Sequence, residues 1–245
     1  MDKLLIPPKE LDYGIKVDHF QATGEEYAEH CRRLAALTPD SRVLDVGCGF
    51  APLGAALTEY LSSAGSYEGI DVVRTGVEWA AQTMTPRFPN FRFTWVDVFN
   101  STYHQAGQLD PRSFRFPFAD NEFDLVYLRS VFTHMLPPEV SHYMAEIRRV
   151  MKPSGRSFIT YFLLNEESID LMTGDSASRN FSYDYGIYRQ TEPGPYATIA
   201  YQEDYIRELY RRHHLSIAGT IHYGRWCGRA DGWSSQDIVI AMKGV

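Results

Sequence analysis

Short apolar runs recur along the chain, and each is followed by a stretch in which apolar residues return at helical spacing. The strand-like runs lie at 42–46, 67–71, 91–96, 124–128 and 156–162, with two more near 215–222 and 236–242. The amphipathic stretches lie at 22–37, 53–61, 75–84, 138–151 and 203–212. Strands that alternate with helices of this length predict parallel βαβ units. We therefore expect one doubly wound α/β domain over residues 1–245.

Two stretches do not follow the alternation. Residues 98–117 are expected to form a loop, and residues 163–200 a longer insertion after the fifth strand. Irregular segments of this length in a compact domain are usually lids or binding loops, so we expect the insertion to supply an acceptor pocket or lid, with Trp226 and Trp233. Its aromatic residues are Phe181, Tyr183, Tyr185, Tyr188 and Tyr196.

Composition and charge narrow the possible partners and the compartment. A net charge of -7 argues against a surface that binds nucleic acid or an anionic membrane. Three cysteines without CxxC spacing suit free thiols in the cytoplasm, and no apolar run approaches the ~18 residues of a membrane span. We name no metal ligands, because Asp120-Asn121 is more typical of a turn than of a ligand pair, and metal dependence stays open.

A glycine-rich turn follows the first predicted strand, in the string Asp45-Val46-Gly47-Cys48-Gly49. Glycines there let the backbone approach a ligand closely. A dinucleotide-binding turn needs a third glycine where Pro52 stands, and a phosphate loop needs a Gly-Lys-Ser/Thr that is missing. Asp45 instead suits a ligand that carries an ammonium and a sulfonium group.

Two more acids come at the ends of the next two strands. Asp71 ends the second strand, where a carboxylate accepts hydrogen bonds from ribose hydroxyls, and Asp97 follows the third, where it could accept from an adenine amine. One such acid is commonly a helix cap. Acids at the ends of three successive strands are harder to explain in that way, and they favour a nucleoside-containing ligand.

These motifs resemble those of class I S-adenosylmethionine-dependent methyltransferases, of the type-11-like kind found in bacterial small-molecule and glycan tailoring. The strings that carry the resemblance are Val43-Leu44-Asp45-Val46-Gly47-Cys48-Gly49, Gly69-Ile70-Asp71-Val72-Val73, Asp97-Val98, Phe123-Asp124-Leu125-Val126, Ser130-Val131-Phe132-Thr133-His134-Met135 and Glu146-Ile147-Arg148-Arg149-Val150-Met151-Lys152-Pro153-Ser154-Gly155. The match spans roughly residues 20–165.

The resemblance implies a Rossmann-like sheet of seven strands, whose last strand inserts antiparallel, and S-adenosylmethionine as the cofactor. Asp45 and the glycine loop would hold its methionine part, Asp71 the ribose, and Asp97 with the Val98 backbone the adenine. Phe20, Gly24 and Tyr27 would close the site. The family usually has a third glycine where this chain has Ala51. The implied cofactor residues are Asp45, Gly47, Cys48, Gly49, Asp71, Val72, Asp97, Val98 and Arg129.

Methyl transfer to a hydroxyl also requires a general base, typically histidine. His134 follows the fourth strand by a few residues and is the first candidate, with a pKa expected near the ordinary value of about 6.5. The alternative is that it packs the following helix. His222 is the second candidate for the base.

We therefore predict an S-adenosylmethionine-dependent O-methyltransferase acting on a small-molecule or saccharide acceptor, with a homodimer possible. N- or C-methylation of a small molecule is the alternative within the class. Outside the class, an NAD-linked oxidoreductase or an inactive cofactor-binding module stays open. Leu128-Arg129-Ser130-Val131 stands where methyltransferases that act on DNA bases carry an Asn/Asp/Ser-Pro-Pro-aromatic motif, which argues against a nucleic-acid substrate.

Overall fold

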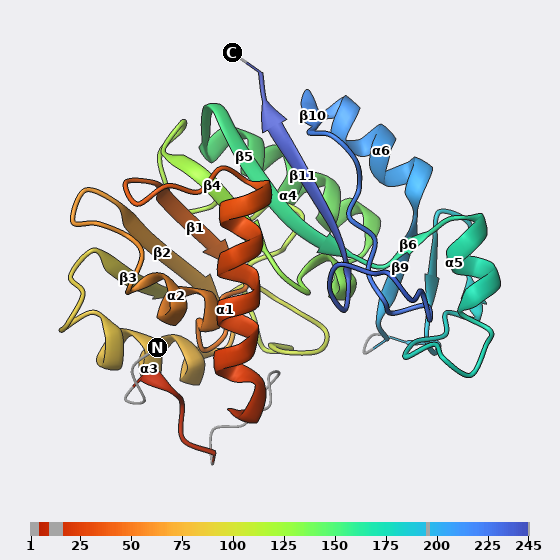
Figure 1. The fold of residues 1–245 in the computed structure, drawn as a ribbon, viewed down its shortest axis with the longest axis horizontal. Helices are drawn as coiled ribbons and strands as arrows, with labels where there is room; N and C mark the ends of the chain where they lie inside the picture. Colours follow the sequence, from red (N-terminus) through yellow and green to blue (C-terminus); the bar gives the residue numbers. More distant parts are fainter. Residues whose placement is uncertain (1–4, 10–16, 195–196, 245) are drawn as a thin grey trace.

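The computed structural model describes residues 5–9, 17–194 and 197–244, and its centre is a seven-stranded sheet (Figure 1). Along the sheet the strand order is β10-β11-β5-β4-β1-β2-β3. These strands are β1 (Arg42–Val46), β2 (Ser66–Asp71), β3 (Phe91–Trp95), β4 (Phe123–Leu128), β5 (Met151–Tyr161), β10 (Leu215–Ile217) and β11 (Asp237–Lys243). The chain reverses its winding direction between β1 and β4, which is where open α/β sheets bind ligands.

The strand directions confirm the predicted sheet. β1 is parallel to both β2 and β4, and β4 is parallel to β5. β11 inserts antiparallel between β5 and β10, as the resemblance implied for the last strand. The carboxyl ends of the parallel strands therefore meet at one edge of the sheet, on the lower side in Figure 1.

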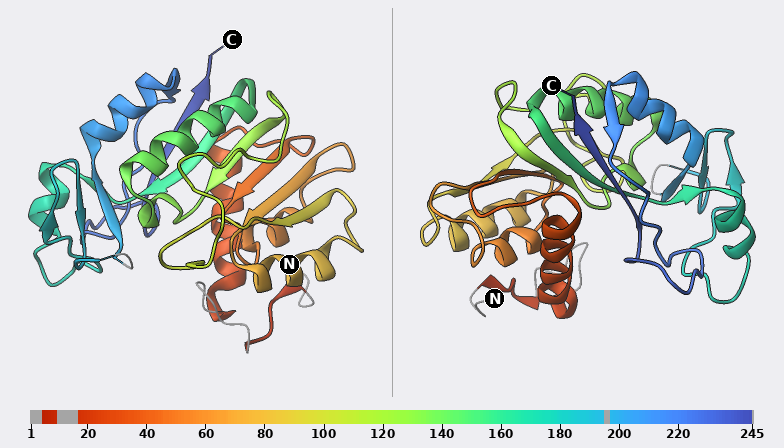
Figure 2. Two further views of the ribbon diagram at one scale, coloured as in Figure 1. Left: turned by 180° about the vertical axis from the view of Figure 1, so that it is seen from behind. Right: turned by 45° about the horizontal axis from the view of Figure 1, so that its top comes forward.

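Helices cover both faces of the sheet and bury a separate apolar layer on each. α1 (Val17–Leu34), α2 (Pro52–Leu57) and α3 (Arg74–Met84) pack on one face. α4 (Pro137–Val150) and α6 (Glu203–Arg212) pack on the other, seen from behind in Figure 2. Alternation along the central strands serves both layers: in β4, Leu125 joins the first layer and Val126 the second. No helix in the described ranges is both long and apolar enough to span a membrane.

Some boundaries differ from the pattern-based prediction. α1 begins at Val17 rather than Ala22, and β5 begins at Met151 rather than Arg156. Lys152-Pro153-Ser154-Gly155 is a helix-stop signal, and α4 does end just before it. These four residues then lie within β5 and do not form a separate turn before the strand. A register shift in β4 between Phe123 and Leu125 accommodates these turn residues. Asp120-Asn121 is a turn, as predicted, with Asn121 at φ 57°.

The insertion is not an irregular loop, and that part of the prediction is wrong. It contains α5 (Glu166–Leu171) and four short strands in the order β6-β9-β8-β7, namely β6 (Leu163–Leu164), β9 (Ile199–Gln202), β8 (Tyr188–Gln190) and β7 (Tyr183–Asp184). A third apolar cluster, which includes Phe162, Phe181 and Trp226, packs this small sheet against the end of the main one. Tyr196 lies outside the described residues. The insertion has its own hydrophobic core.

Asp237 attaches the insertion to the main sheet. This fully buried carboxylate accepts hydrogen bonds from the backbone N–H of Leu163 (2.7 Å), the backbone N–H of Gly224 (2.7 Å) and Nε1 of Trp226 (2.8 Å). Burial raises its pKa to about 6 in spite of these donors. One side chain at the start of β11 thus connects the end of β5 with the loop that precedes β11.

We expect Asp237→Ala to lower the free energy of unfolding by about 2–4 kcal/mol, because it leaves three buried donors without an acceptor. Urea unfolding followed by circular dichroism measures this. Asp170→Ala, which changes an exposed carboxylate on α5, is the matched control and should leave the midpoint within error. Equal midpoints for the two variants would contradict the anchoring role of Asp237.

Candidate active site

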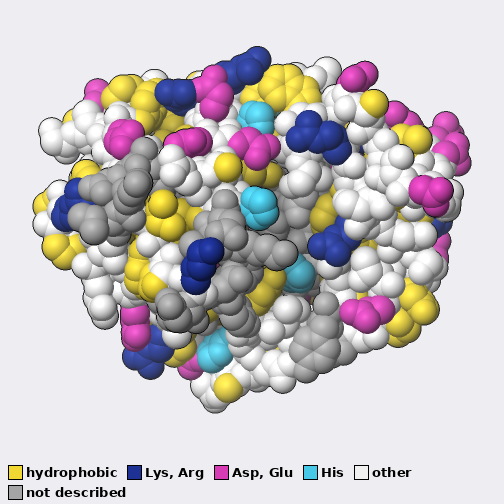
Figure 3. Space-filling view, turned by 60° about the horizontal axis from the view of Figure 1, so that its bottom comes forward, with side chains coloured by type: hydrophobic (Ala, Val, Ile, Leu, Met, Phe, Trp, Pro, Cys, Tyr) yellow, Lys and Arg dark blue, Asp and Glu magenta, His cyan; other side chains and the backbone are white. Residues whose placement is uncertain are grey.

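A cavity of about 240 Å³ lies where the parallel strands end. Its walls come from the glycine loop after β1, the end of β2, the segment 96–114, the turn after β4 and the first turns of α4. Figure 3 views this side of the molecule, where histidine and apolar side chains lie close together near the middle. The cavity therefore lies at the crevice that the winding order predicts.

The glycine loop is held tightly against its neighbours. The backbone N–H groups of Gly47 (2.8 Å) and Cys48 (3.1 Å) both donate to the carbonyl of Ile70 in β2. Gly47 has φ 79°, and a Cβ there would come within 2.5 Å of Val131 Cγ2 in the turn after β4. A Cβ on Gly49 would meet no described atom within 4 Å, so this glycine leaves open space beside the cavity. Glycine is thus required at Gly47 by packing against the opposite wall.

Ala51 takes the place of the usual third glycine and keeps the conformation that glycine favours. It has φ 55° and ψ 56°, in the left-handed region, and is fully buried at the start of α2. Its N–H donates to the carbonyl of Cys48 at 2.7 Å. The left-handed region costs a residue with a Cβ about 1–2 kcal/mol, so the loop keeps its shape against a local preference.

Asp71 joins the end of β2 to the glycine loop. One carboxylate oxygen accepts from the backbone N–H of Gly49 at 2.6 Å, and the other accepts from that of Val73 at 2.7 Å. Burial raises the pKa of this carboxyl group even though both N–H donors act to lower it. Asp71 lines the cavity, as predicted, and it also determines the shape of the loop around it.

Asp45 is the most unusual group in the cavity wall. It is 2% exposed; its Oδ2 accepts from the Tyr67 hydroxyl, and its Oδ1 is buried without a hydrogen-bond partner in the described part of the chain. Burial raises its pKa to about 7, the Tyr67 hydrogen bond and the Arg129 charge lower it, and the Asp71 charge raises it. An unpartnered buried carboxylate oxygen beside a cavity is suited to accept from a ligand.

Arg129 lies near Asp45 and packs against Tyr27 of α1. Its guanidinium carbon is 4.9 Å from the centre of the Tyr27 ring, and its Nε is buried with no described hydrogen-bond partner. The next residue, Ser130, has φ 58°, and its N–H donates to Thr160 Oγ1 at 2.9 Å. Gln236 Nε2 donates to Ser130 Oγ at 2.9 Å. These bonds from β5 and the start of β11 fix the turn that presents Arg129.

Most of the predicted cofactor residues meet at the cavity. The residues on its wall are Asp45, Gly47, Cys48, Gly49, Asp71, Val72, Val98 and Arg129, together with Phe20 from α1. Gly24 and Tyr27 are also buried residues of α1. The Tyr27 ring packs against the Arg129 guanidinium and is not itself part of the wall.

Asp97 is the predicted cofactor residue that does not line the cavity. Its carboxylate pairs with His104 Nε2 at 2.7 Å, and its carbonyl accepts from the Leu109 N–H. The wall there is made by Val96, Val98 and Phe99. Alternation along the extended backbone directs Asp97 away from its two neighbours, so contact with an adenine stays a prediction that this arrangement does not favour.

His222 does not line the cavity either. Its ring packs on Trp233 with 4.6 Å between centres, and its backbone pairs with Ile238. Trp233 also contacts His30 and Arg33 of α1, while Trp226 is buried in the core of the insertion. A role for His222 as a second base stays a prediction that this arrangement does not favour, because the residue packs beside α1 and outside the cavity wall.

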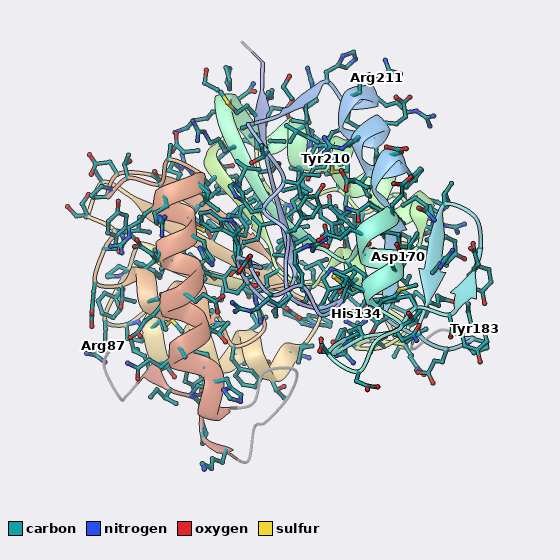
Figure 4. All side chains as sticks on the ribbon, turned by 45° about the vertical axis from the view of Figure 1, so that its right-hand side comes forward. Arg87, His134, Asp170, Tyr183, Tyr210 and Arg211 are labelled. Carbon is teal, nitrogen blue, oxygen red and sulfur yellow. The ribbon has the colours of Figure 1, made fainter. Side chains whose placement is uncertain are left out.

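No described residue of the insertion lines the cavity. Part of the wall comes instead from residues 98–114, the other stretch that departs from the strand–helix alternation. Figure 4 shows His134 between the main sheet and the insertion, with Tyr183 farther out. Arg179 of the insertion is near enough for its charge to lower the pKa of His134. A lid function for residues 163–200 stays a prediction.

His134 lies in the cavity wall, in the 3-10 turn η3 (Phe132–His134) between β4 and α4. Its Nε2 is 3.4 Å from the Tyr103 hydroxyl, and its Nδ1 is buried without a described partner. Burial, with a smaller effect from the Arg179 charge, lowers its pKa to about 4. The expected value near 6.5 is therefore wrong, and the ring is neutral over the physiological range.

Several wall residues were not predicted as site residues from the sequence, among them Tyr103, Glu139 and Tyr143. Glu139 caps α4 by accepting from the Leu136 N–H at 2.7 Å, and burial raises its pKa. Leu136-Pro137-Pro138-Glu139 is a helix-start sequence that identifies Glu139 as a cap. Nothing in the sequence indicates that the same carboxylate faces a cavity.

Comparison with known proteins agrees with this arrangement. Residues 44–159 match a family described as a methyltransferase domain. Sterol 24-C-methyltransferase ERG6B of Gibberella zeae is 26% identical over 192 residues, covering 71% of this chain and 44% of that protein. Phthiotriol/phenolphthiotriol dimycocerosates methyltransferase 1 of Mycobacterium ulcerans is 32% identical over 114 residues, covering 46% of this chain and 35% of that protein. The chain thus spans less than half the length of these two relatives.

Solved structures share the fold at low sequence identity. The PH0226 protein of Pyrococcus horikoshii superposes with a TM-score of 0.62 and 14% identity, over 96% of this chain and 94% of that protein. Identity this low is informative about the fold alone.

We expect the ring signals of His134 to show no titration from pH 8 to pH 5. The folded chain binds this proton near pH 4, whereas the unfolded chain binds it near pH 6.5, so this group's contribution to stability falls as the pH is lowered through that window. Proton NMR of the histidine ring, with His134→Gln to assign the signal, measures this. A midpoint near 6.5 would mean that the ring is solvated.

Proposed function

We propose that this chain, which has the fold and a matching domain of a class I S-adenosylmethionine-dependent methyltransferase, transfers a methyl group to a hydroxyl of a small-molecule acceptor. The observation that carries the proposal is the cavity itself. One half is made by the glycine loop with Asp45 and Asp71, and the other half by Tyr103, His134 and Glu139. Cofactor and acceptor groups would thus share one enclosed space.

The residues of the first half fit S-adenosylmethionine. Asp45 offers a buried, unpartnered carboxylate oxygen, which suits the ammonium group of the methionine part. The open space at Gly49 admits a ligand close to the backbone, and Asp71 stands where ribose hydroxyls would need an acceptor. When bound, the cofactor supplies an electrophilic methyl group on a sulfonium. The chain itself would contribute orientation and exclusion of water.

In the second half, polar side chains are positioned to orient an acceptor hydroxyl. Neutral His134 can accept a hydrogen bond, and Tyr103 beside it can accept or donate. A base with a pKa near 4 is weak. His134 would therefore take the hydroxyl proton only while the bond between the acceptor oxygen and the methyl carbon forms, when that proton becomes more acidic. Glu139 offers a second acceptor on the same wall.

C-methylation of a small molecule is the second candidate. It is favoured by the low pKa of His134, since a carbon nucleophile needs no base before the methyl group is transferred. The sterol relative is itself named as a C-methyltransferase. Carboxylates such as Glu139 would then stabilise the positive charge that develops on the acceptor.

We also propose a cytoplasmic enzyme that acts on neither nucleic acid nor membrane surfaces, with a homodimer as one possible assembly. The net charge of -7 supports the first part. An NAD-linked oxidoreductase is disfavoured by the family match and by Pro52 in the turn. An inactive cofactor-binding module would bind the cofactor but show no turnover.

Calorimetry should detect binding of S-adenosylhomocysteine with a Kd near 1 μM, roughly 8 kcal/mol, and no binding of NAD. Binding at pH 6.5 should also release a proton, because an ammonium group beside Asp45 would lower a pKa that is about 7 in the free protein. The released proton is measured as a difference in heat between buffers of different ionisation enthalpy.

The control is Asp45→Asn, which keeps the shape and removes the titrating group. It should bind more weakly and show equal heats in both buffers. Tight NAD binding without S-adenosylhomocysteine binding would overturn the proposed function. Proton release that persists in Asp45→Asn would overturn only the assignment of Asp45.

We expect His134→Gln to lower kcat by about 10²-fold or more for a hydroxyl acceptor while the affinity for S-adenosylhomocysteine stays within twofold. A screen of sugars, phenols and amines for S-adenosylhomocysteine release supplies the acceptor. His222→Gln, outside the cavity, is the matched control and should keep wild-type kcat. Unchanged kcat per folded molecule in His134→Gln would instead favour C- or N-methylation without a base.

A further inference from the structure

A second hollow adjoins the cavity on its acceptor side. This groove has a volume of about 420 Å³, and it shares Phe99, Pro111 and Glu139 with the cavity. Its remaining wall comes from residues 107–112 and from the start of α4. The cavity and the groove therefore lie side by side and share part of their lining.

The groove has an unusual concentration of exposed apolar surface. Phe99, Leu109 and Leu136 all line it, and they are 40%, 46% and 42% exposed. Large apolar side chains that gather on one surface mark an interaction site, whereas single ones need no explanation. These three come from two segments that the fold brings together next to the cavity.

The wall is preformed by backbone pairing. Phe99 N–H donates to the Leu109 carbonyl and Leu109 N–H to the Asp97 carbonyl, both at 2.9 Å. Gly107 makes this possible, since a Cβ there would come within 2.4 Å of the Phe99 nitrogen. The apolar side chains are thus held in place before a ligand arrives, which lowers the entropic cost of binding.

The groove also carries three charged side chains. Arg112 and Asp110 pair with each other at 2.6 Å. Glu139 Oε2 accepts from Leu136 N–H, and this residue lines both the groove and the cavity. The groove thus combines exposed apolar side chains with one carboxylate that it shares with the cavity.

We propose that this groove binds the apolar body of an elongated, amphiphilic acceptor, whose polar, methyl-accepting end lies in the cavity beside Glu139. The proposal rests on the proposed function and narrows its acceptor class. A saccharide would need donors and acceptors along its whole length, and the Asp110 and Arg112 side chains are engaged with each other. A hydrocarbon chain or fused apolar ring of a small molecule matches the exposed Phe99, Leu109 and Leu136, with Glu139 as the polar group shared with the cavity.

The test is the binding of 4-alkylphenols, from 4-methylphenol to 4-hexylphenol, to the protein saturated with S-adenosylhomocysteine. Each added methylene should tighten the Kd by about fourfold in the wild type, the usual value for burying a CH₂ group. The double variant Leu109→Ser with Leu136→Ser should flatten this series to less than twofold per methylene. Leu171→Ser, which changes a 37% exposed leucine on α5, is the matched control and should keep the wild-type slope.

S-adenosylhomocysteine binding is measured first on every variant, and the alkylphenol series is repeated without it. Failure of S-adenosylhomocysteine to bind wild-type protein would overturn the proposed function, whatever the alkylphenols do. With S-adenosylhomocysteine bound, a flat wild-type series would overturn the groove proposal alone. A slope that survives in the double variant would also overturn the groove proposal. So would a wild-type dimer that the double variant abolishes, because the groove would then hold a second copy of the chain.

Discussion

The Asp71 carboxylate joins the end of β2 to the glycine loop after β1, and the shape of the cavity depends on this connection. Its two oxygens accept from the backbone on either side, at Gly49 in the glycine loop and at Val73 before α3. The loop is also bound to the Ile70 carbonyl and packs without a Cβ against Val131. Because three strand ends converge within a few residues, a change in one wall would move the others.

The same edge of the sheet carries a concentration of buried carboxylates, and their environments differ. Asp237 has three donors and acts as an attachment point between the insertion and the sheet. Asp71 has two backbone donors. Asp45 has the Tyr67 hydroxyl on one oxygen and no described partner on the other, although a buried polar atom is usually paired. The fold tolerates this cost at the position where a cationic ligand group would offset it.

The side of the cavity that we propose to hold the acceptor is organised differently. Residues 98–109 fold back on themselves, and the capped start of α4 faces them across the cavity. This places apolar side chains next to a few polar ones, of which His134 is kept neutral by burial and the charge of Arg179. An acceptor would meet hydrogen-bonding groups at the strand ends and apolar surface farther out. Such a wall suits orientation of a small molecule better than strong proton abstraction.

Much of the fold and half of the site follow from local sequence. Apolar runs, helix caps and turn residues act over a few positions, so the strands, the glycine loop and the acids Asp45 and Asp71 could be predicted where the structure has them. The strands inside the insertion are too short to show an alternating pattern among the turn residues, so the sequence predicts an irregular segment there.

The rest was decided by contacts between distant parts of the chain. Asp97 turns to His104, and His222 packs on Trp233 beside α1, so neither lines the cavity. Glu139 reaches the wall because α4 begins opposite residues 98–114, a relation that no sequence pattern encodes. Side-chain direction and burial depend on which segments the sheet order brings together. The sequence alone therefore determined the sheet and its cofactor edge, while only tertiary packing determined the acceptor wall and the neutral state of His134.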